Sequence, residues 1–183
     1  MKLLCVTGKR GSGKSVITKI ASRHGIRSVE MHEPVYDAMT KRNIPLTHEN
    51  IIKFSEGLRE KKDFGIVAKM MLKKIRKERM KDNILVICGI RHPDEVREFR
   101  KRYDCLFLAI DADPKIRFKR IMARAKKEDP KTIEQFIKKE QNENKMLGID
   151  KAMKPADVTI TNNKGIREFS EKLDNLIRFM VKK

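Results

Sequence analysis

The segment from Gly8 to Ser15 constrains the fold of this 183-residue chain more than any other. Its letters, GKRGSGKS, fit the pattern GxxxxGK[ST] at every required position. The context fits as well, because the apolar run Leu3–Thr7 precedes the segment and Val16–His24 has the character of a helix. A loop of this kind (hereafter the P-loop) joins a buried strand to the start of a helix. The sequence therefore predicts an α/β domain built around this turn.

Each part of the P-loop suits the binding of phosphate groups. Glycines let the backbone curl so that several N–H groups converge on an anion, and the helix N-terminus adds partial positive charge. The residues predicted to hold the phosphates are Gly8, Lys9, Arg10, Gly11, Ser12, Gly13, Lys14 and Ser15. Lys14 is predicted to reach the β- and γ-phosphates, and the Ser15 hydroxyl to ligate Mg²⁺. We expect ATP rather than GTP, because no NKxD-type guanine signature is evident.

The rest of the chain alternates between strand and helix patterns. Short apolar runs, typical of strands buried on both faces of a parallel sheet, recur along the sequence. They occur at Leu3–Thr7, Ile84–Cys88, Leu106–Ile110 and Val158–Thr161, and a further strand is expected near Arg27–Met31. Asp113-Pro114 and Asp129-Pro130 both have the form of a helix start. The alternation predicts a three-layer α/β sandwich.

The composition is strongly basic, with 44 Lys and Arg against 25 Asp and Glu and a formal net charge of +19. Such a charge attracts polyanions, namely the triphosphate, a phosphorylated acceptor or RNA, although a lysine-rich solvated surface is the alternative. No apolar run approaches the roughly 18 residues of a membrane span, and the apolar start is too short for a secretory leader. We therefore expect a cytoplasmic protein with no membrane partner. Cys5, Cys88 and Cys105 lie in strand-like runs without metal-ligand spacing, which predicts buried thiols.

The chain resembles the small P-loop kinases, the group of nucleoside monophosphate kinases and dephospho-coenzyme A kinase. More closely, it is similar to an archaeal family described as adenylate-kinase-related. Besides the P-loop, the segments that carry this resemblance are Gly57-Leu58-Arg59-Glu60, Gly89-Ile90-Arg91, Glu95–Phe99, Pro114–Arg120, Asp129–Thr132 and Ala156–Val158. The resemblance implies a three-layer α/β/α P-loop NTPase fold with a five-stranded parallel sheet of order 2-3-1-4-5. It also implies one domain over residues 1–183, with a helical acceptor-side insert at 33–81 and a lid region at 120–147.

The resemblance implies roles for several side chains on the acceptor side. In such kinases a carboxylate after the second strand orients the acceptor or a magnesium-bound water, and Glu33 stands in that place; Glu33-Pro34 suits a helix start equally well. Arg59 in the insert and Arg91 after the third strand are the candidates for holding a phosphate of the acceptor. Arginine suits this task because its planar fork binds two phosphate oxygens at once.

On the lid side, Arg117, Arg120 and Arg124 have the spacing of one helix face. Arg120 and Arg124 are the favoured catalytic pair, closing over the transferring phosphoryl group and stabilising its charge. The alternative is a basic helix face exposed to solvent. The loop Asn162–Gly165 lies near the nucleotide base in similar kinases, although its letters are also those of a plain turn.

One position departs from the family pattern. Relatives tend to carry aspartate at the end of the third strand, where it assists Mg²⁺ through water, and here that residue is Cys88. A neutral thiol is a poor ligand for a hard cation. Transfer of a phosphoryl group therefore requires compensation by another carboxylate, for which Glu33, Asp104 and Asp111 are the candidates.

Two functional hypotheses follow from these features. The first is a kinase that transfers the γ-phosphoryl of Mg-ATP to a small nucleotide-like or coenzyme-like acceptor. The second is a nucleotide-dependent switch or weak ATPase that acts on RNA or a ribosomal particle. The second is motivated by nine basic and two acidic residues between Lys61 and Lys81. The chain carries no RNP, KH or zinc-finger signature, which disfavours it.

Overall fold

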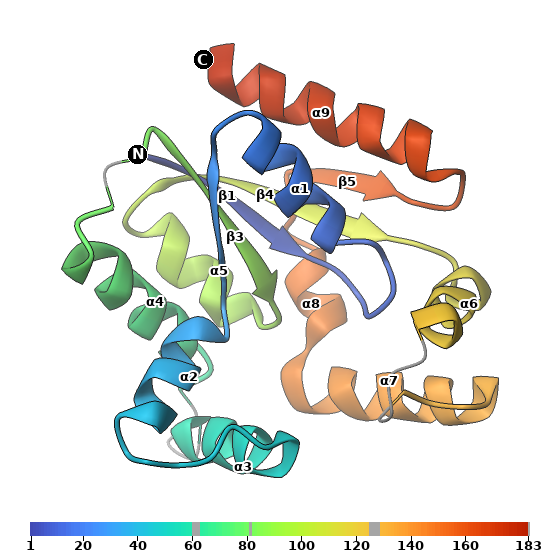
Figure 1. Ribbon diagram of the computed structural model, residues 1–183, viewed down its shortest axis with the longest axis horizontal. Helices are drawn as coiled ribbons and strands as arrows, with labels where there is room; N and C mark the ends of the chain where they lie inside the picture. The colour runs from blue at the N-terminus through green and yellow to red at the C-terminus, as the bar shows by residue number, and fades with distance from the viewer. Residues whose placement is uncertain (60–62, 81, 125–128, 183) are drawn as a thin grey trace.

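A computed structural model of the chain describes residues 1–59, 63–80, 82–124 and 129–182 (Figure 1). The strands are β1 (Lys2–Thr7), β2 (Arg27–Glu30), β3 (Ile84–Ile90), β4 (Asp104–Asp111) and β5 (Val158–Thr161). The helices are α1 (Ser15–Arg23), α2 (Glu33–Thr40), α3 (His48–Arg59), α4 (Ile66–Lys77), α5 (Pro93–Arg100), α6 (Pro114–Arg124), α7 (Ile133–Leu147), α8 (Ile149–Met153) and α9 (Ile166–Lys182). The strands form one sheet in the order β2-β3-β1-β4-β5, which confirms the predicted order.

All neighbouring strands of this sheet are parallel. The central strand β1 has β3 on one side and β4 on the other, so that Val6 lies opposite Cys88 and Leu108. On the far side of β3, Glu30 of β2 also lies opposite Cys88. Because the carboxyl ends of parallel strands meet at one edge, the loops that follow them converge there, which is where open α/β sheets bind ligands.

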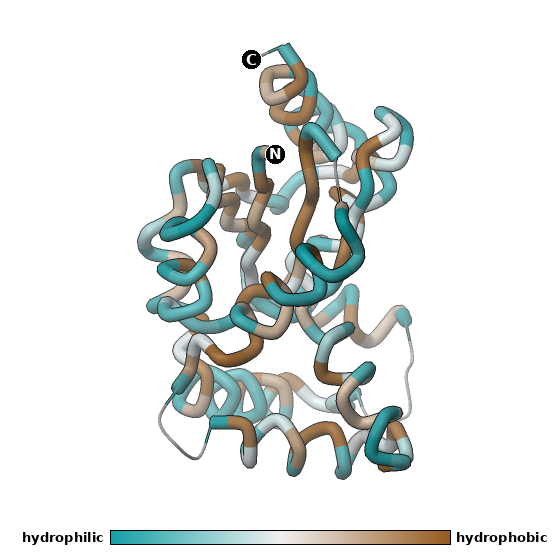
Figure 2. The backbone as a smooth tube through the Cα atoms, turned by 90° about the vertical axis from the view of Figure 1, so that its left-hand side faces the viewer, coloured by the Kyte–Doolittle hydropathy of each residue, from teal (hydrophilic) through white to brown (hydrophobic). Residues whose placement is uncertain are grey.

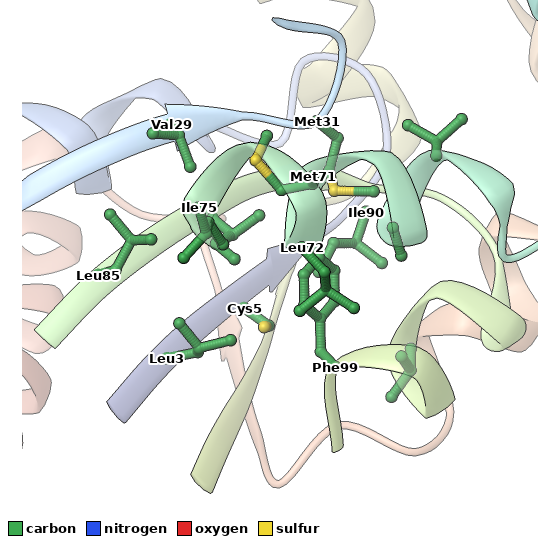
Figure 3. Packing of buried hydrophobic residues seen from close by; sticks show 14 of the residues in the cluster. Leu3, Cys5, Val29, Met31, Met71, Leu72, Ile75, Leu85, Ile90 and Phe99 are labelled. Carbon is green, nitrogen blue, oxygen red and sulfur yellow. The ribbon is translucent and has the colours of Figure 1, made fainter. Parts of the chain in front are cut away.

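Helices cover both faces of the sheet, as the alternation of strand side chains requires. Leu3 and Cys5 of β1 join a buried cluster with α2, α4 and α5, whereas Leu4 and Val6 join a second cluster with α1 and α9. Figure 3 shows the first cluster, in which the methionine and aliphatic side chains of α4 pack over β1 and β3. Each such side chain contributes about 1.5–3 kcal/mol to stability by leaving water. Hydrophobic segments accordingly run along the strands in Figure 2 and alternate with hydrophilic ones around the helices.

Two helix starts can be compared with their predicted positions. The start at Asp113-Pro114 is confirmed, since the Asp113 carboxylate accepts a hydrogen bond from the Lys115 N–H at 2.8 Å. The start predicted at Asp129-Pro130 is wrong by three residues, because α7 begins at Ile133. Its N-cap is Thr132, whose side chain accepts a hydrogen bond from the Gln135 N–H. The Asp129 carboxylate is used elsewhere, by Arg124.

The predicted insert (33–81) contains α2, α3 and α4, and the predicted lid (120–147) contains the end of α6 and all of α7. Residues 60–62, 81 and 125–128 of these two regions lie outside the described residues. Cys5 and Cys88 are buried and Cys105 is partly buried, all three as free thiols. Within the described part of the chain, no helix is long and apolar enough to cross a bilayer.

Candidate nucleotide-binding site

The P-loop leaves the central strand at Thr7 and enters α1 at Ser15. Three of its glycines, Gly8, Gly11 and Gly13, are required by both backbone angle and space. Gly11 has a φ of +78°, and a Cβ there would lie 2.7 Å from the Arg117 carbonyl oxygen; Gly13 has a φ of +103°, and its Cβ would collide with the Asn162 amide. The loop is therefore held tightly between α6 and the segment that follows β5.

The loop has the features that an anion site requires. The N–H groups of Val16 and Ile17 donate to the Gly13 and Lys14 carbonyls at 3.0 and 3.2 Å, and the N-terminus of α1 adds partial positive charge at the loop. The Ser12 hydroxyl is fully buried and has no hydrogen-bond partner among the described residues. The Lys14 ammonium donates to the carbonyl oxygens of Gly8 at 2.5 Å and Lys9 at 2.8 Å, which keeps its charge over the loop. The exposed Ser15 hydroxyl stands at the helix start, where it is accessible to a metal ion. These residues fit a Mg²⁺–nucleotide.

Three cations extend from the P-loop towards α3. Burial lowers the pKa of Lys14 to about 8, and the charge of Arg91 adds to this effect. The pKa of Arg59 is also lowered, chiefly by burial, with a further contribution from Arg91. Arg91 directly follows β3, and the Glu95 carboxylate contacts both Arg91 and Arg59. Such close cations repel each other, and an anion placed among them would relieve that repulsion.

One carboxylate only partly compensates this positive charge. Glu95 is buried, and its Oε2 accepts hydrogen bonds from the N–H groups of Arg91 at 2.8 Å and His92 at 3.2 Å. Its other oxygen lies 3.9 Å from Arg59. The Arg59 Nε is buried without a hydrogen-bond partner in the described residues, although its Nη1 donates to Ser55. Donors thus remain for an anionic ligand.

Glu30 brings a second carboxylate to the same edge of the sheet. It is the last residue of β2, lies opposite Cys88, and its Oε2 would be 3.3 Å from a Cβ on Gly89. Burial raises the pKa of Glu30, and the nearby charges of His32 and Lys14 oppose this rise. Burial also raises the pKa of Cys88 to about 12, with a contribution from Glu30, so the thiol is neutral at physiological pH. The carboxylate beside Lys14 is therefore supplied by β2.

The other wall of the P-loop is built by Asn162 and Arg120. The Asn162 amide donates to the Ser12 carbonyl at 2.8 Å. Arg120 Nη2 donates to the carbonyl and side-chain oxygens of Asn162 at 3.0 and 3.1 Å. The Arg120 Nη1 is buried and has no hydrogen-bond partner in the described part of the chain. Arg120 is thus held against the loop, and its Nη1 is available to donate hydrogen bonds to a ligand.

Arg117 is the most deeply buried cation near the P-loop, with 1% of its surface exposed. Its Nε donates to the Ala112 carbonyl at 2.8 Å, and its Nη1 donates to the Arg10 carbonyl at 3.3 Å. The same guanidinium makes a two-point ion pair with Glu140 of α7 and lies over the Phe136 ring. It therefore connects the P-loop to α7.

Comparisons with known proteins agree with this arrangement. Residues 4–147 match the profile of a family described as an AAA domain. A UPF0200 protein of Pyrococcus horikoshii is 34% identical over 178 residues, which cover 96% of this chain and 95% of the relative. The chain belongs to the UPF0200 family.

Among solved structures, a dephospho-CoA kinase from Campylobacter jejuni has a TM-score of 0.60 at 16% identity, covering 100% of this chain and 98% of that one. A shikimate kinase from Bacteroides thetaiotaomicron has a TM-score of 0.61 at 10% identity, covering 100% and 99%. These structures show that the UPF0200 fold is that of P-loop kinases.

The structure brings together some of the predicted site residues of this UPF0200 chain and separates others. The charge of Arg91 acts on both Lys14 and Arg59, and Arg120 contacts Asn162, which in turn bonds the P-loop. Arg124, by contrast, is engaged with Asp129 through Nε at 2.7 Å and Nη2 at 2.6 Å. The catalytic roles of Arg120 and Arg124 stay predictions.

The candidate carboxylates also differ in position. Glu33 begins α2, where its Oε1 accepts from the Glu30 N–H at 2.8 Å and its Oε2 lies 3.7 Å from Lys74. Its predicted acceptor-binding role likewise stays a prediction. Asp104 begins β4, at the opposite edge of the sheet from the P-loop, because the strands are parallel. It is therefore too far away to compensate for Cys88. Asp111, at the correct edge, accepts from the Ala112 N–H.

Three residues near the site were missed or underrated by the sequence analysis: Glu30, Asn162 and Arg117. Glu30 ends a strand of only four residues, so its position relative to Glu33 depends on where that strand stops. Arg117 shares a helix with two other arginines, and helical spacing alone cannot tell which of them is buried. The turn-like letters after β5 gave a signal for Asn162, since a side-chain amide can bond backbone at such a turn.

The lowered pKa of Lys14 predicts that nucleotide binding takes up protons above neutral pH. Phosphate charge favours the protonated amine, so it raises the pKa of Lys14 from about 8. At pH 8, we expect uptake of about half a proton per Mg²⁺–ATP analogue bound, and almost none at pH 6.5, where Lys14 is already charged. Calorimetric titration in two buffers of different ionisation enthalpy measures this number. Proton release at pH 8, or equal uptake at both pH values, would contradict it.

Proposed function

We propose that this protein is a phosphotransferase that moves the γ-phosphoryl of Mg-ATP to a small, nucleotide-like or coenzyme-like acceptor with an anionic group. The observation that carries the proposal is the group of cations Lys14, Arg91 and Arg59 near the P-loop, in which the buried Glu95 carboxylate contacts both Arg91 and Arg59. A nucleotide-binding loop needs only the first of these. The other two extend the positive charge to where a second anionic molecule would meet the γ-phosphate.

The donor is held by the P-loop backbone, with Lys14 on the β- and γ-phosphates. Ser15 would hold Mg²⁺ directly, and Glu30 would hold one of the water molecules bound to Mg²⁺. Glu30 would thus play the role of the aspartate that relatives carry at the position of Cys88. Bound Mg²⁺ neutralises charge on the phosphate oxygens and aligns them. Glu30 suits this position because Mg²⁺ keeps several waters and prefers oxygen ligands.

The acceptor is held by Arg59 and Arg91, whose forks bind phosphate oxygens in pairs. In the reaction, the acceptor oxygen forms a bond to the γ-phosphorus as the bond between that phosphorus and the β–γ bridging oxygen breaks. ADP leaves with the electron pair, and where the attacking oxygen of the acceptor is a hydroxyl, its proton passes to solvent water. Catalysis comes from alignment and from charge stabilisation by Lys14, Arg91 and the predicted lid residues Arg120 and Arg124.

An acceptor panel tests this proposal. Purified protein is supplied with Mg-ATP and, in turn, with each nucleoside monophosphate and with dephospho-coenzyme A, and ADP formation is followed in a coupled assay. A Lys14→Ala variant, prepared in the same way, sets the background. The dephospho-CoA kinase and shikimate kinase neighbours support kinase chemistry only through their fold. If no acceptor gives ADP above the Lys14→Ala background, the proposal is rejected for these acceptor classes.

Substitution of Glu30 tests the proposed substitute for the missing aspartate. Glu30→Gln keeps the size of the side chain but removes its charge, so we expect about a 10–100-fold loss in kcat or in the apparent affinity for Mg²⁺. The measurement is the rate of transfer as a function of Mg²⁺ concentration at fixed ATP. Asp37→Asn, which removes an exposed carboxylate paired with Lys74, is the matched control and should behave as wild type. Equal behaviour of the two variants would place the metal partner elsewhere.

The alternative function, a switch or weak ATPase that acts on RNA or a ribosomal particle, gains little from the basic run that motivated it. Lys69 pairs with Asp63, and Lys74 lies within ion-pair distance of Asp37, Glu33 and Glu78. Part of the positive charge is thus neutralised within the protein. Residues 61, 62 and 81 of the run lie outside the described residues.

A further inference from the structure

Lys9 and Arg10 occupy two of the x positions of the P-loop pattern, and both are paired with carboxylates from a distant part of the chain. Lys9 Nζ lies 2.8 Å from the Asp150 carboxylate of α8 and 3.6 Å from Glu140 of α7. Arg10 lies 3.8 Å from Glu143 of α7 through Nη2 and 3.7 Å from Asp129 through Nη1. In Figure 1, α7 and α8 lie beneath the carboxyl edge of the sheet, on the side of the P-loop. Negative charge therefore faces the loop that is built to bind anions.

These contacts are electrostatically coupled to the phosphate site. Although burial lowers the pKa of Lys9, the hydrogen bond that Lys9 donates to Asp150 and the charge of Glu140 outweigh it, so the pKa of Lys9 is raised. Glu143 acts on Lys14 as well, since its charge is among those that raise the pKa of Lys14. The α7 carboxylates thus compete for the same cations that a triphosphate engages.

The ion pairs differ in how easily they can open. In the Arg117–Glu140 pair the guanidinium is buried and donates two hydrogen bonds to the carboxylate, and such bidentate pairs are costly to break. The Lys9–Asp150 and Arg10–Glu143 pairs involve partly exposed side chains, and their interactions are weak. A bound triphosphate would both attract Lys9 and Arg10 and repel Glu143 and Asp150.

We propose that Glu143 and Asp150 form a latch that holds α7 and α8 against the P-loop, and that the phosphates of the nucleotide open this latch by taking over Lys9 and Arg10. The inference rests on the proposed binding of a triphosphate at the P-loop. Arg117 and Glu140 stay paired and act as the pivot. The latch makes the affinity for a nucleotide depend on α7, because part of the binding free energy is used to release it.

Hydrogen–deuterium exchange of the wild-type protein tests the opening. Tripolyphosphate and a non-hydrolysable ATP analogue, each with Mg²⁺, are added in separate arms. We expect amides of the P-loop to become protected while exchange in the second half of α7 and in α8 becomes faster. Unchanged or slower exchange in α7 and α8 at saturating ligand would overturn the latch. Because tripolyphosphate carries no base or sugar, an effect of tripolyphosphate without binding of the analogue would support the latch and count against the proposed nucleotide. Absence of binding in both arms would overturn both.

Matched variants test the contribution of the latch to affinity. In Glu143→Gln/Asp150→Asn, two weak ion pairs are removed, and we expect the ATP analogue to bind about 3–10-fold more tightly. Faster exchange in α7 is expected even before ligand is added. Glu134→Gln is the control, because it removes the same charge from an exposed position on the same helix. If the control tightens binding as much as the double variant, or the double variant binds no tighter than wild type, the carboxylates are ordinary surface pairs and the latch is wrong.

Discussion

Replacing Lys14 with alanine is expected to lower the rate of phosphoryl transfer by about 10²–10³-fold, the usual loss when one preorganised donor to developing negative charge is removed. The ammonium is held over the loop by the Gly8 and Lys9 carbonyl oxygens, so it is already placed when the phosphates arrive. The charges of Arg91 and Glu30 both act on it, the first lowering and the second raising the pKa of Lys14. The measurement is kcat and kcat/KM for the acceptor found in the panel.

Lys19→Ala is the matched control for this variant. Lys19 is an exposed lysine on the same helix, α1, and its loss removes the same charge without touching the loop. We expect its activity to be within about twofold of wild type, since exposed charges at a distance are screened. Similar losses in both variants would mean that general positive charge, rather than the placed ammonium, supports the reaction.

Replacing Arg117 with methionine is expected to have the largest effect on stability. The substitution removes donors to the Ala112 and Arg10 carbonyls and leaves Glu140 without its two-point partner. Breaking a buried pair costs about 3–5 kcal/mol, and we take the lower end because Glu140 is 23% exposed. For a domain of this size, a loss of about 3 kcal/mol lowers Tm by about 6–12 °C. Thermal unfolding followed by circular dichroism measures this shift.

Arg124→Met is the comparison for this prediction, because Arg124 lies on the same helix and also pairs with a carboxylate. Its side chain is 39% exposed, and its buried partner Asp129 keeps Arg10 at 3.7 Å, so we expect a smaller loss of stability, about 1 kcal/mol. Equal shifts in Tm for the two variants would show that burial of Arg117 does not matter. A larger shift for Arg117→Met would instead identify it as the structural link between the P-loop and α7.

The amino-acid sequence by itself determined the P-loop, the alternation of strands and helices and, through the family resemblance, the strand order β2-β3-β1-β4-β5. These features are predictable because their causes are local: eight contiguous residues create the anion-binding turn, and a run of apolar residues is enough to indicate a buried strand. Cys88 was also identified, through the family pattern, as a residue unsuited to Mg²⁺. Its thiol is buried, and burial raises its pKa to about 12.

The tertiary structure alone decided which members of a set of similar residues face the site. Glu30 and Glu33 are three residues apart, yet the charge of Glu30 acts on Lys14, whereas Glu33 begins α2 and accepts a hydrogen bond from the Glu30 N–H, because β2 ends at Glu30. Likewise, among the three arginines on α6 Arg117 is the buried one, since it meets both the Arg10 carbonyl and α7. Burial and charge pairing between distant segments are set by how the elements pack, and no local pattern in the chain encodes them.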